Sequence, residues 1–277
     1  MNDTFALFSL LSHPGVSSPI ACQLIQFLGS AEAVLQERDK TTKPPDGVRD
    51  SLWKKLKAPE IRKKAEKAWA KIEKERVSFV DYRQDDFPLL LNHTDGPLLL
   101  FYRGKQFPRT DKIVSIVGTR KPTKDALVFT KTIVESIQHI NPIIISGLAE
   151  GIDVGAHQAA LDAGLQTYAC LAHGVNQCYP AFHSKIKAKI EEQGGCLTEH
   201  LLDSPLHPGY FLRRNRIIAG LSHATIVVAS RPKGGAMVTG RLAFDYNRAL
   251  FAVPGSPNYP THLGCNQLIK IKYCSTP

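Results

Sequence analysis

The chain of 277 residues is long enough for one sizeable hydrophobic core and a small second one. Its hydrophobic content of 43% and charged content of 22% are typical of a globular protein. No apolar run is long enough to cross a bilayer, and the basic start of a signal peptide is missing. We therefore expect a cytoplasmic protein that is not associated with a membrane.

The formal net charge of +10 is unevenly distributed along the chain. Residues 38–76 contain 14 Lys or Arg and 7 Asp or Glu, so their net charge is 14 − 7 = +7. One interpretation is a surface that attracts an acidic polymer such as nucleic acid. The other is a solvated helix and linker. The six cysteines and ten histidines have no metal-ligand spacing, which predicts no metal site.

Residues 1–76 are predicted to form a small all-α module with a basic linker helix. Phe5 and Phe8, and later Leu24 and Leu28, have helical spacing. The sequence "HPGVS" at 13–17 joins these helices and indicates either a helix-hairpin-helix whose turn amides face a DNA phosphate or a module that only packs on the main domain.

The basic linker helix is expected to begin near Pro59 and to be amphipathic. Ile61, Ala65, Trp69 and Ile72 fall on one face, opposite a lysine-rich face. On such a stripe Trp69 is expected to pack into a core, the alternative being a residue that stacks on a nucleic-acid base.

Residues 77–277 alternate short β-rich apolar runs with longer helical patterns. This alternation predicts an extended Rossmann-like, doubly wound, mostly parallel sheet with helices on both faces. Runs at 77–82 and 97–104 are read as preliminary strands. The main strands are predicted at 112–118, 142–147, 166–172, 195–199, 224–230 and 250–255, and the helices at 125–140, 152–164, 184–193, 214–222 and 241–249.

Glycines and cations follow the predicted strands, where ligands of such sheets bind. Glycines allow close backbone approach, and helix N-termini and fixed cations attract anions. Phe182 lies beside lysines, an arrangement that suits base stacking in single strands; Tyr179 either stacks in the same way or packs under its loop. The predicted phosphate or DNA site comprises Gly118, Thr119, Arg120, Ser146, Gly147, Phe182, Lys185, Arg214, Asn215, Arg216, Lys233, Gly234 and Gly235.

Other motifs limit what this site does. "VGTR" lacks the later glycines of a GxGxxG fingerprint, and no GxxxxGK[ST] sequence is present. No nucleophile, base or carboxylate pair forms a recognisable catalytic group, so we expect no enzyme activity and no cofactor. Arg214 and Arg216 have an alternative role, which is to pair with Asp153 or Glu199 inside the protein.

The motifs "SIVGTR", "SGLAEGID", "GVNQCYP", "RNRIIAGLS", "GGAMVT", "LFAVPGS" and "GCNQLI" together resemble the DNA-processing protein A (DprA, or Smf) family. The resemblance covers about 77–269, and the N-terminal region resembles the small sterile-alpha-motif-like module of many members. The chain departs from the family pattern at Asn176, usually acidic, and at Leu212, often proline.

This resemblance implies a bacterial cytoplasmic protein that binds and protects incoming single-stranded DNA during natural transformation, dimerises through its Rossmann domain and loads the RecA recombinase, without catalytic turnover. It assigns Gly118, Thr119 and Arg120 to the family's phosphate-binding motif and places Lys185 near a DNA-contacting lysine. The alternative is a nucleotide phosphoribohydrolase of the related "lonely guy" type, and a third possibility is a protein scaffold that does not bind nucleic acid.

Overall fold

The computed structural model describes residues 3–37, 43–56, 59–91, 95–109, 112–204 and 206–271, with the backbone alone at 59–61 and 89. The chain forms two compact units, Met1–Phe87 with Thr94–Leu100 and Pro88–His93 with Phe101–Pro277. The first unit includes strand β1 (Ser78–Asp81). The domain boundary after residue 76 stays a prediction.

The first unit is mainly helical, with α1 (Asp3–Leu11), α2 (Ser18–Leu28), α3 (Ala31–Glu37), α4 (Asp50–Leu56) and α5 (Pro59–Lys74). The helices predicted around Phe8 and Leu24 are confirmed as α1 and α2, and both side chains are fully buried. Phe27, on the other side of α2, is 51% exposed. Gly15, in the turn between them, has a φ of +91°, which favours glycine. Both interpretations of this turn remain predictions.

Trp69 of α5 packs into an aromatic cluster of the first unit. Its ring centroid lies 5.5 Å from that of Phe5, 5.1 Å from Phe8 and 5.2 Å from Phe79. Ala65 and Ile72, on the same side of the helix, are each 1% exposed, and the side chain of Ile61 lies outside the described residues. The interpretation of Trp69 as a packing residue is therefore confirmed.

The sheet has eight strands in the order β1-β2-β6-β5-β4-β3-β7-β8. Strand β2 (Leu99–Gly104) runs antiparallel to β6 (Gly195–Thr198). The others, β3 (Ile113–Val117), β4 (Ile143–Ser146), β5 (Thr167–Cys170), β7 (Ala224–Val227) and β8 (Ala249–Ala252), are parallel to their neighbours and to β6. The predicted Rossmann-like fold is confirmed.

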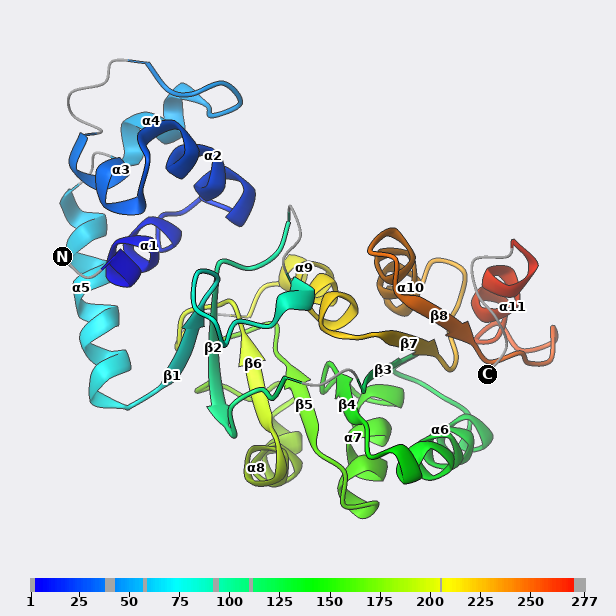
Figure 1. Ribbon diagram of the computed structural model, residues 1–277. Helices are drawn as coiled ribbons and strands as arrows, with labels where there is room; N and C mark the ends of the chain where they lie inside the picture. The colour runs from blue at the N-terminus through cyan, green and yellow to red at the C-terminus, as the bar shows by residue number, and fades with distance from the viewer. Residues whose placement is uncertain are drawn as a thin grey trace. The chain divides into compact units, whose positions relative to one another are not determined.

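Helices cover both faces of this sheet. Figure 1 shows α6 (Lys124–Ile137), α7 (Ile152–Asp162) and α8 (Ser184–Gln193) on one face and α9 (Pro208–Leu221) and α10 (Gly235–Asp245) on the other. A short helix, α11 (Leu263–Lys270), follows β8. Single 3₁₀ turns occupy Leu89–Leu91, Gln138–Ile140 and Ala181–His183.

Two helix starts differ from the sequence-based prediction. Helix α9 begins at Pro208 instead of residue 214, because proline is well suited to the first helical position. Helix α10 begins at Gly235 instead of residue 241, with Gly234 as its extended N-cap. The pair of glycines is typical of a loop, yet here it forms the first residues of a helix. Helix α11 was not predicted.

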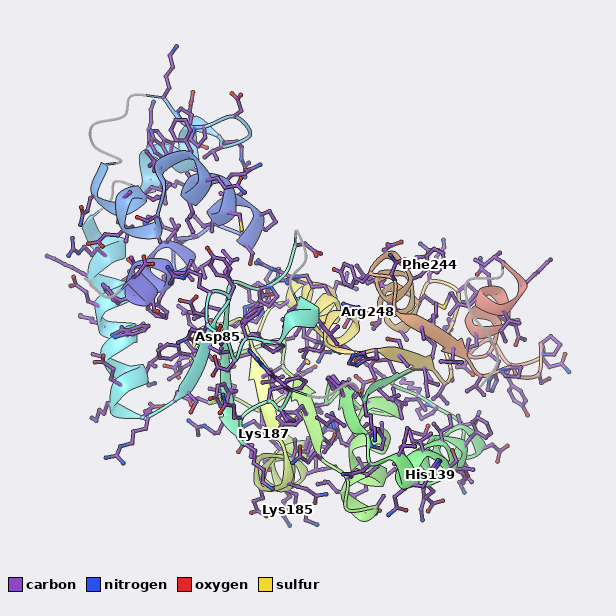
Figure 2. All side chains as sticks on the ribbon, viewed as in Figure 1. Asp85, His139, Lys185, Lys187, Phe244 and Arg248 are labelled. Atoms are coloured by element: carbon purple, nitrogen blue, oxygen red, sulfur yellow. The ribbon has the colours of Figure 1, made fainter. Side chains whose placement is uncertain are left out.

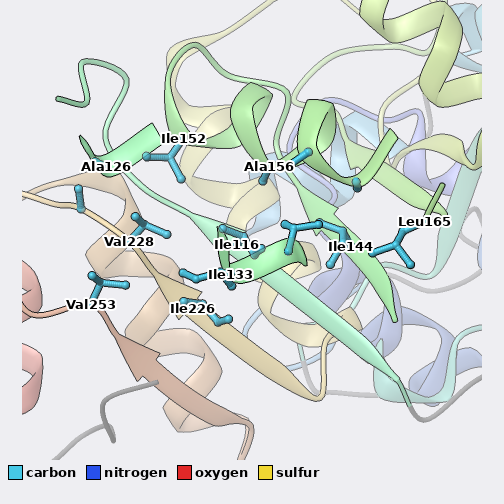
Figure 3. Packing of buried hydrophobic residues seen from close by; sticks show 14 residues of the cluster. Ile116, Ala126, Ile133, Ile144, Ile152, Ala156, Leu165, Ile226, Val228 and Val253 are labelled. Atoms are coloured by element: carbon cyan, nitrogen blue, oxygen red, sulfur yellow. The ribbon is translucent and has the colours of Figure 1, made fainter. Parts of the chain in front are cut away.

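The core between the sheet and its α6–α7 face is built from branched side chains on strands and small ones on α7. Ile116, Ile144 and Ile226 come from three strands, and they pack with Ala156 and Ala160 of α7 (Figure 3). Ile116, Ile144 and both alanines are fully buried. Alanines bring the axis of α7 close to the sheet, which places its N-terminus near the ends of β3 and β4.

The N-cap of α6 offers a modest test of the fold. Thr123 Oγ1 accepts a hydrogen bond from the Ala126 amide at 3.2 Å. Thr123→Ala is expected to lower the free energy of unfolding by about 1 kcal/mol, because it removes a capping acceptor. Urea denaturation measures the change. Thr132→Ala, at an exposed mid-helix position, is the control and should be nearly neutral; equal losses at both positions would contradict the capping role.

Candidate anion-binding site

A cavity of about 330 Å³ lies where the strand order of the sheet reverses. The chain leaves β3 toward β4 on one side, whereas β7 pairs with β3 on the other. The loops after β3 and β7 then lead to helices on opposite faces, which opens a crevice between them. The cavity is lined by Val117, Gly118, Thr119, Arg120, Ala149, Asp153, Phe211, Leu212, Arg214, Asn215, Ile218, Ser230, Arg231, Gly234, Gly235, Ala236 and Thr239.

The loop at 118–120 is fixed on both sides by backbone hydrogen bonds. The Thr119 amide donates to the Ala229 carbonyl at 2.7 Å, and the Thr119 carbonyl accepts from the Ile152 amide at 3.2 Å. A Cβ on Gly118 would lie 2.5 Å from a side-chain carbon of Ile152. Only glycine fits this contact, so Gly118 allows the loop to lie against the start of α7.

Arg120 extends from this loop over the ring of Phe211, which packs against the ring of Tyr179. Its guanidinium carbon lies 5.1 Å from the ring centroid of Phe211, and the Phe211 and Tyr179 centroids are 5.7 Å apart. Arg120 is exposed, Tyr179 is 45% exposed and Phe211 is half-buried. A cation next to exposed rings can hold a phosphate while a base stacks. Phe211 is not among the site residues predicted from the sequence, although its spacing from Arg214 places both on one side of α9.

The other side of the cavity is the N-terminus of α10. Gly234 is the N-cap, and a Cβ added to Gly235 would meet no atom within 4 Å, so the backbone here is open to a ligand. A helix N-terminus presents backbone N–H groups and a partial positive charge. Arg231 is exposed and lines the cavity, whereas Lys233 is exposed outside it.

Arg214 and Asp153 are buried charged residues below the cavity that interact electrostatically. The Arg214 guanidinium donates to the carbonyl of Gly147 at 2.6 Å and to that of Cys170. Burial lowers the pKa of Arg214, and Asp153 opposes that change. Burial also raises the pKa of Asp153, against the effect of Arg214 and of backbone amides that include Gly118. Arg214 therefore supports the loops and is not a free cation.

Several predicted site residues have structural roles instead. Ser146 is fully buried, and its hydroxyl donates to the Ile116 carbonyl at 2.6 Å, so it belongs to the core. Arg216 is 8% exposed and paired with Glu199, which also lies 3.2 Å from Arg213. Gly147 lies directly against the Arg214 guanidinium, where a Cβ would come within 2.3 Å of a nitrogen. The internal-pairing alternative holds for Arg216, which pairs with Glu199, whereas Arg214 donates to backbone carbonyls and interacts with Asp153 electrostatically.

Phe182 and Lys185 lie outside the cavity lining. Phe182 is 70% exposed and packs edge-on against His183. Lys185 is exposed on the first turn of α8, whereas Lys187 on the same helix is buried, with its ammonium donating to the Val175 carbonyl at 3.0 Å (Figure 2). Roles for Phe182, Lys185 and Lys233 in DNA binding remain predictions.

Neither a metal site nor a membrane-spanning helix is present among the residues that the structure describes. In that part of the chain, no group of three His, Cys, Asp or Glu side chains is arranged to hold a metal ion. None of the helices described has the length and apolar character needed to span a membrane.

Comparison with known proteins decides the family. A sequence model described as DNA recombination-mediator protein A matches residues 78–275. The chain belongs to this family. It is 38% identical over 184 residues to protein Smf of Escherichia coli and 37% identical over 189 residues to protein Smf of Synechocystis, covering 66% of this chain in each case. It spans about half the length of these two relatives, 49% and 48% respectively.

Two solved structures of family members share the fold. DNA processing protein A (DprA) of Streptococcus pneumoniae superposes with a TM-score of 0.79 at 26% identity, over 94% of this chain and 90% of that one. DNA processing protein A of Helicobacter pylori, whose structure concerns its single-stranded DNA binding mode, gives a TM-score of 0.64 at 28% identity, over 73% of this chain and 90% of that one.

Proposed function

We propose that this chain binds the backbone of single-stranded DNA at the cavity between β3 and β7. The observation that carries the proposal is a crevice with outward cations, Arg120 and Arg231, facing the open N-terminus of α10. Its one acidic lining residue, Asp153, is buried beside Arg214. A strand needs repeated anion contacts, and the rings beside Arg120 favour exposed bases over a paired duplex.

Membership of the family supports further proposals about the process. We infer that the protein acts as a cytoplasmic recombination mediator in natural transformation, protecting incoming single strands, forming a homodimer through its Rossmann-like domain and loading the RecA recombinase. It acts without turnover. Assembly of RecA filaments on protein-coated single strands, followed with and without this protein, tests the loading step, and sedimentation tests the dimer.

Arg120→Ala is expected to weaken binding of single-stranded DNA about tenfold, because a guanidinium that contacts phosphate is lost. The slope of log affinity against log salt concentration should fall by about 0.7 for each lost contact, equally for different sequences. Fluorescence anisotropy with labelled oligonucleotides at several salt concentrations measures both effects.

Arg241→Ala is the matched control, since Arg241 is an exposed residue of α10 that does not line the cavity. Equal affinity of wild type and Arg120→Ala at every salt concentration would show that the cavity is not the binding site. The phosphoribohydrolase alternative predicts release of free base from nucleoside monophosphates, and the scaffold alternative predicts no binding to an oligonucleotide at low salt.

A further inference from the structure

Five lysines form a continuous band along α5 of the first unit. At 3.6 residues per turn they fall within an arc of about 100° around the helix axis. Lysines four residues apart are separated by about 6 Å along the helix axis, so the band is linear and extends along most of the helix. We call this band the lysine stripe; it consists of Lys63, Lys64, Lys67, Lys71 and Lys74.

The opposite face of α5 fixes the direction of the stripe. Ala65 and Ile72 are buried, and the Trp69 ring contacts Phe5, Phe8 and Phe79 in the core of the first unit. With this face held in the core, the stripe is turned outward. Lys63, Lys64, Lys67 and Lys74 are exposed, and Lys71 is half-buried.

The acidic residues of α5 and its end mostly have partners outside the stripe. Glu66 pairs with Arg62 at 3.1 Å, and Glu73 accepts a hydrogen bond from the Trp69 indole at 2.8 Å. Glu75 pairs with Lys71 at 3.5 Å. Within the side chains that the structure describes, the other four lysines of the stripe have no ion-pair partner. The stripe therefore carries a largely uncompensated positive charge.

We propose that the lysine stripe is a second contact surface for nucleic acid, which holds the phosphate backbone without reading bases. Lysine ammonium groups act as point charges and suit phosphates met at varied angles. A linear band of charge matches a linear polyanion. A membrane surface fits less well, because the apolar face of α5 that would enter a bilayer is already packed in the core. No lysine of the stripe lines the cavity, so either proposal can fail without the other.

The test is a triple substitution in the full chain, Lys63→Gln, Lys67→Gln and Lys74→Gln. We expect about tenfold weaker binding to a labelled oligothymidine at low salt, and a salt slope smaller by about 2. Because the stripe contacts only phosphate, duplex binding should weaken by a similar factor, whereas Arg120→Ala should act mainly on the single strand. Lys43→Gln, Lys54→Gln and Lys55→Gln together remove the same charge from exposed positions of the first unit and should have a smaller effect.

A second experiment detects contact between the stripe and DNA directly. Acetylation of surface lysines, mapped by mass spectrometry, should be slowed at Lys63, Lys67 and Lys74 when DNA is bound and unchanged at Lys54 and Lys55. Equal losses of affinity in the two triple variants, or unchanged acetylation of the stripe, would overturn the proposal. So would stronger protection of the stripe by anionic phospholipid vesicles than by DNA. Circular dichroism confirms that the variants are folded.

Discussion

Arg214→Met is expected to lower the free energy of unfolding by about 3 kcal/mol, because it leaves two buried backbone carbonyls, those of Gly147 and Cys170, without a donor. It also removes the positive charge that partly offsets the burial of Asp153, which is 6% exposed. Chemical denaturation monitored by circular dichroism measures the loss. We expect Arg214→Met to be the most damaging single change of an arginine in this chain.

The control and the coupling test use residues of the same region. Arg213→Ala removes a side chain that is 39% exposed and should cost less than about 1 kcal/mol. Combining Arg214→Met with Asp153→Asn should cost less than the sum of the two single changes, because the second substitution removes the uncompensated carboxylate. A double variant whose loss equals that sum would show that the two side chains do not stabilise each other.

Gly151→Ala is expected to lower the free energy of unfolding by about 3 kcal/mol and to weaken single-strand binding as well. Gly151 has a φ of +82°, which strains any residue with a side chain. A Cβ at this position would also lie 2.3 Å from the Thr119 carbonyl oxygen and 2.8 Å from that of Arg120, and backbone atoms cannot move away cheaply. The loop that carries Arg120 must therefore shift.

Gly164→Ala separates the cost of backbone strain from the cost of the close contact with the 118–120 loop. Gly164 also has a positive φ, +71°, but a Cβ there would meet no atom within 4 Å. It should cost only the backbone strain, about 1 kcal/mol, and leave DNA binding unchanged. Denaturation and anisotropy on both variants make the comparison. Equal free energies of unfolding for Gly151→Ala and Gly164→Ala would mean that the close contact with the 118–120 loop does not contribute to the destabilisation.

The strands and the loops that follow them could be predicted because the sequence patterns that indicate them involve only a few neighbouring residues. A β-rich apolar run followed by glycine, as at Gly118, is visible in a short window of sequence. Parallel strands then bring such loops to one edge of the sheet, where Thr119, Arg120, Gly234 and Gly235 line one cavity.

The buried arginines could not be assigned in the same way. Sequence reasoning expects charged residues of a helix to face solvent, but α9 is buried from Arg214 to Leu221 because it packs across the sheet. Its charges therefore meet internal partners that are distant in sequence, Glu199 for Arg216 and the Gly147 and Cys170 carbonyls for Arg214. Phe211 could not be assigned for a similar reason, because its place in the site depends on its contact with Arg120, which lies in another loop.

The two backbone hydrogen bonds of Thr119 have a consequence for how the loop recognises an anion. Its amide and its carbonyl are both occupied within the protein, and its hydroxyl oxygen accepts from the Lys121 amide at 3.2 Å. At Thr119 the donor left for a ligand is thus the side-chain hydroxyl hydrogen, and Arg120 adds its guanidinium. A cradle of main-chain amides tolerates most substitutions. The contacts that the Thr119 hydroxyl and the Arg120 guanidinium make with a ligand depend instead on residue identity, so point mutations can change them without rebuilding the backbone.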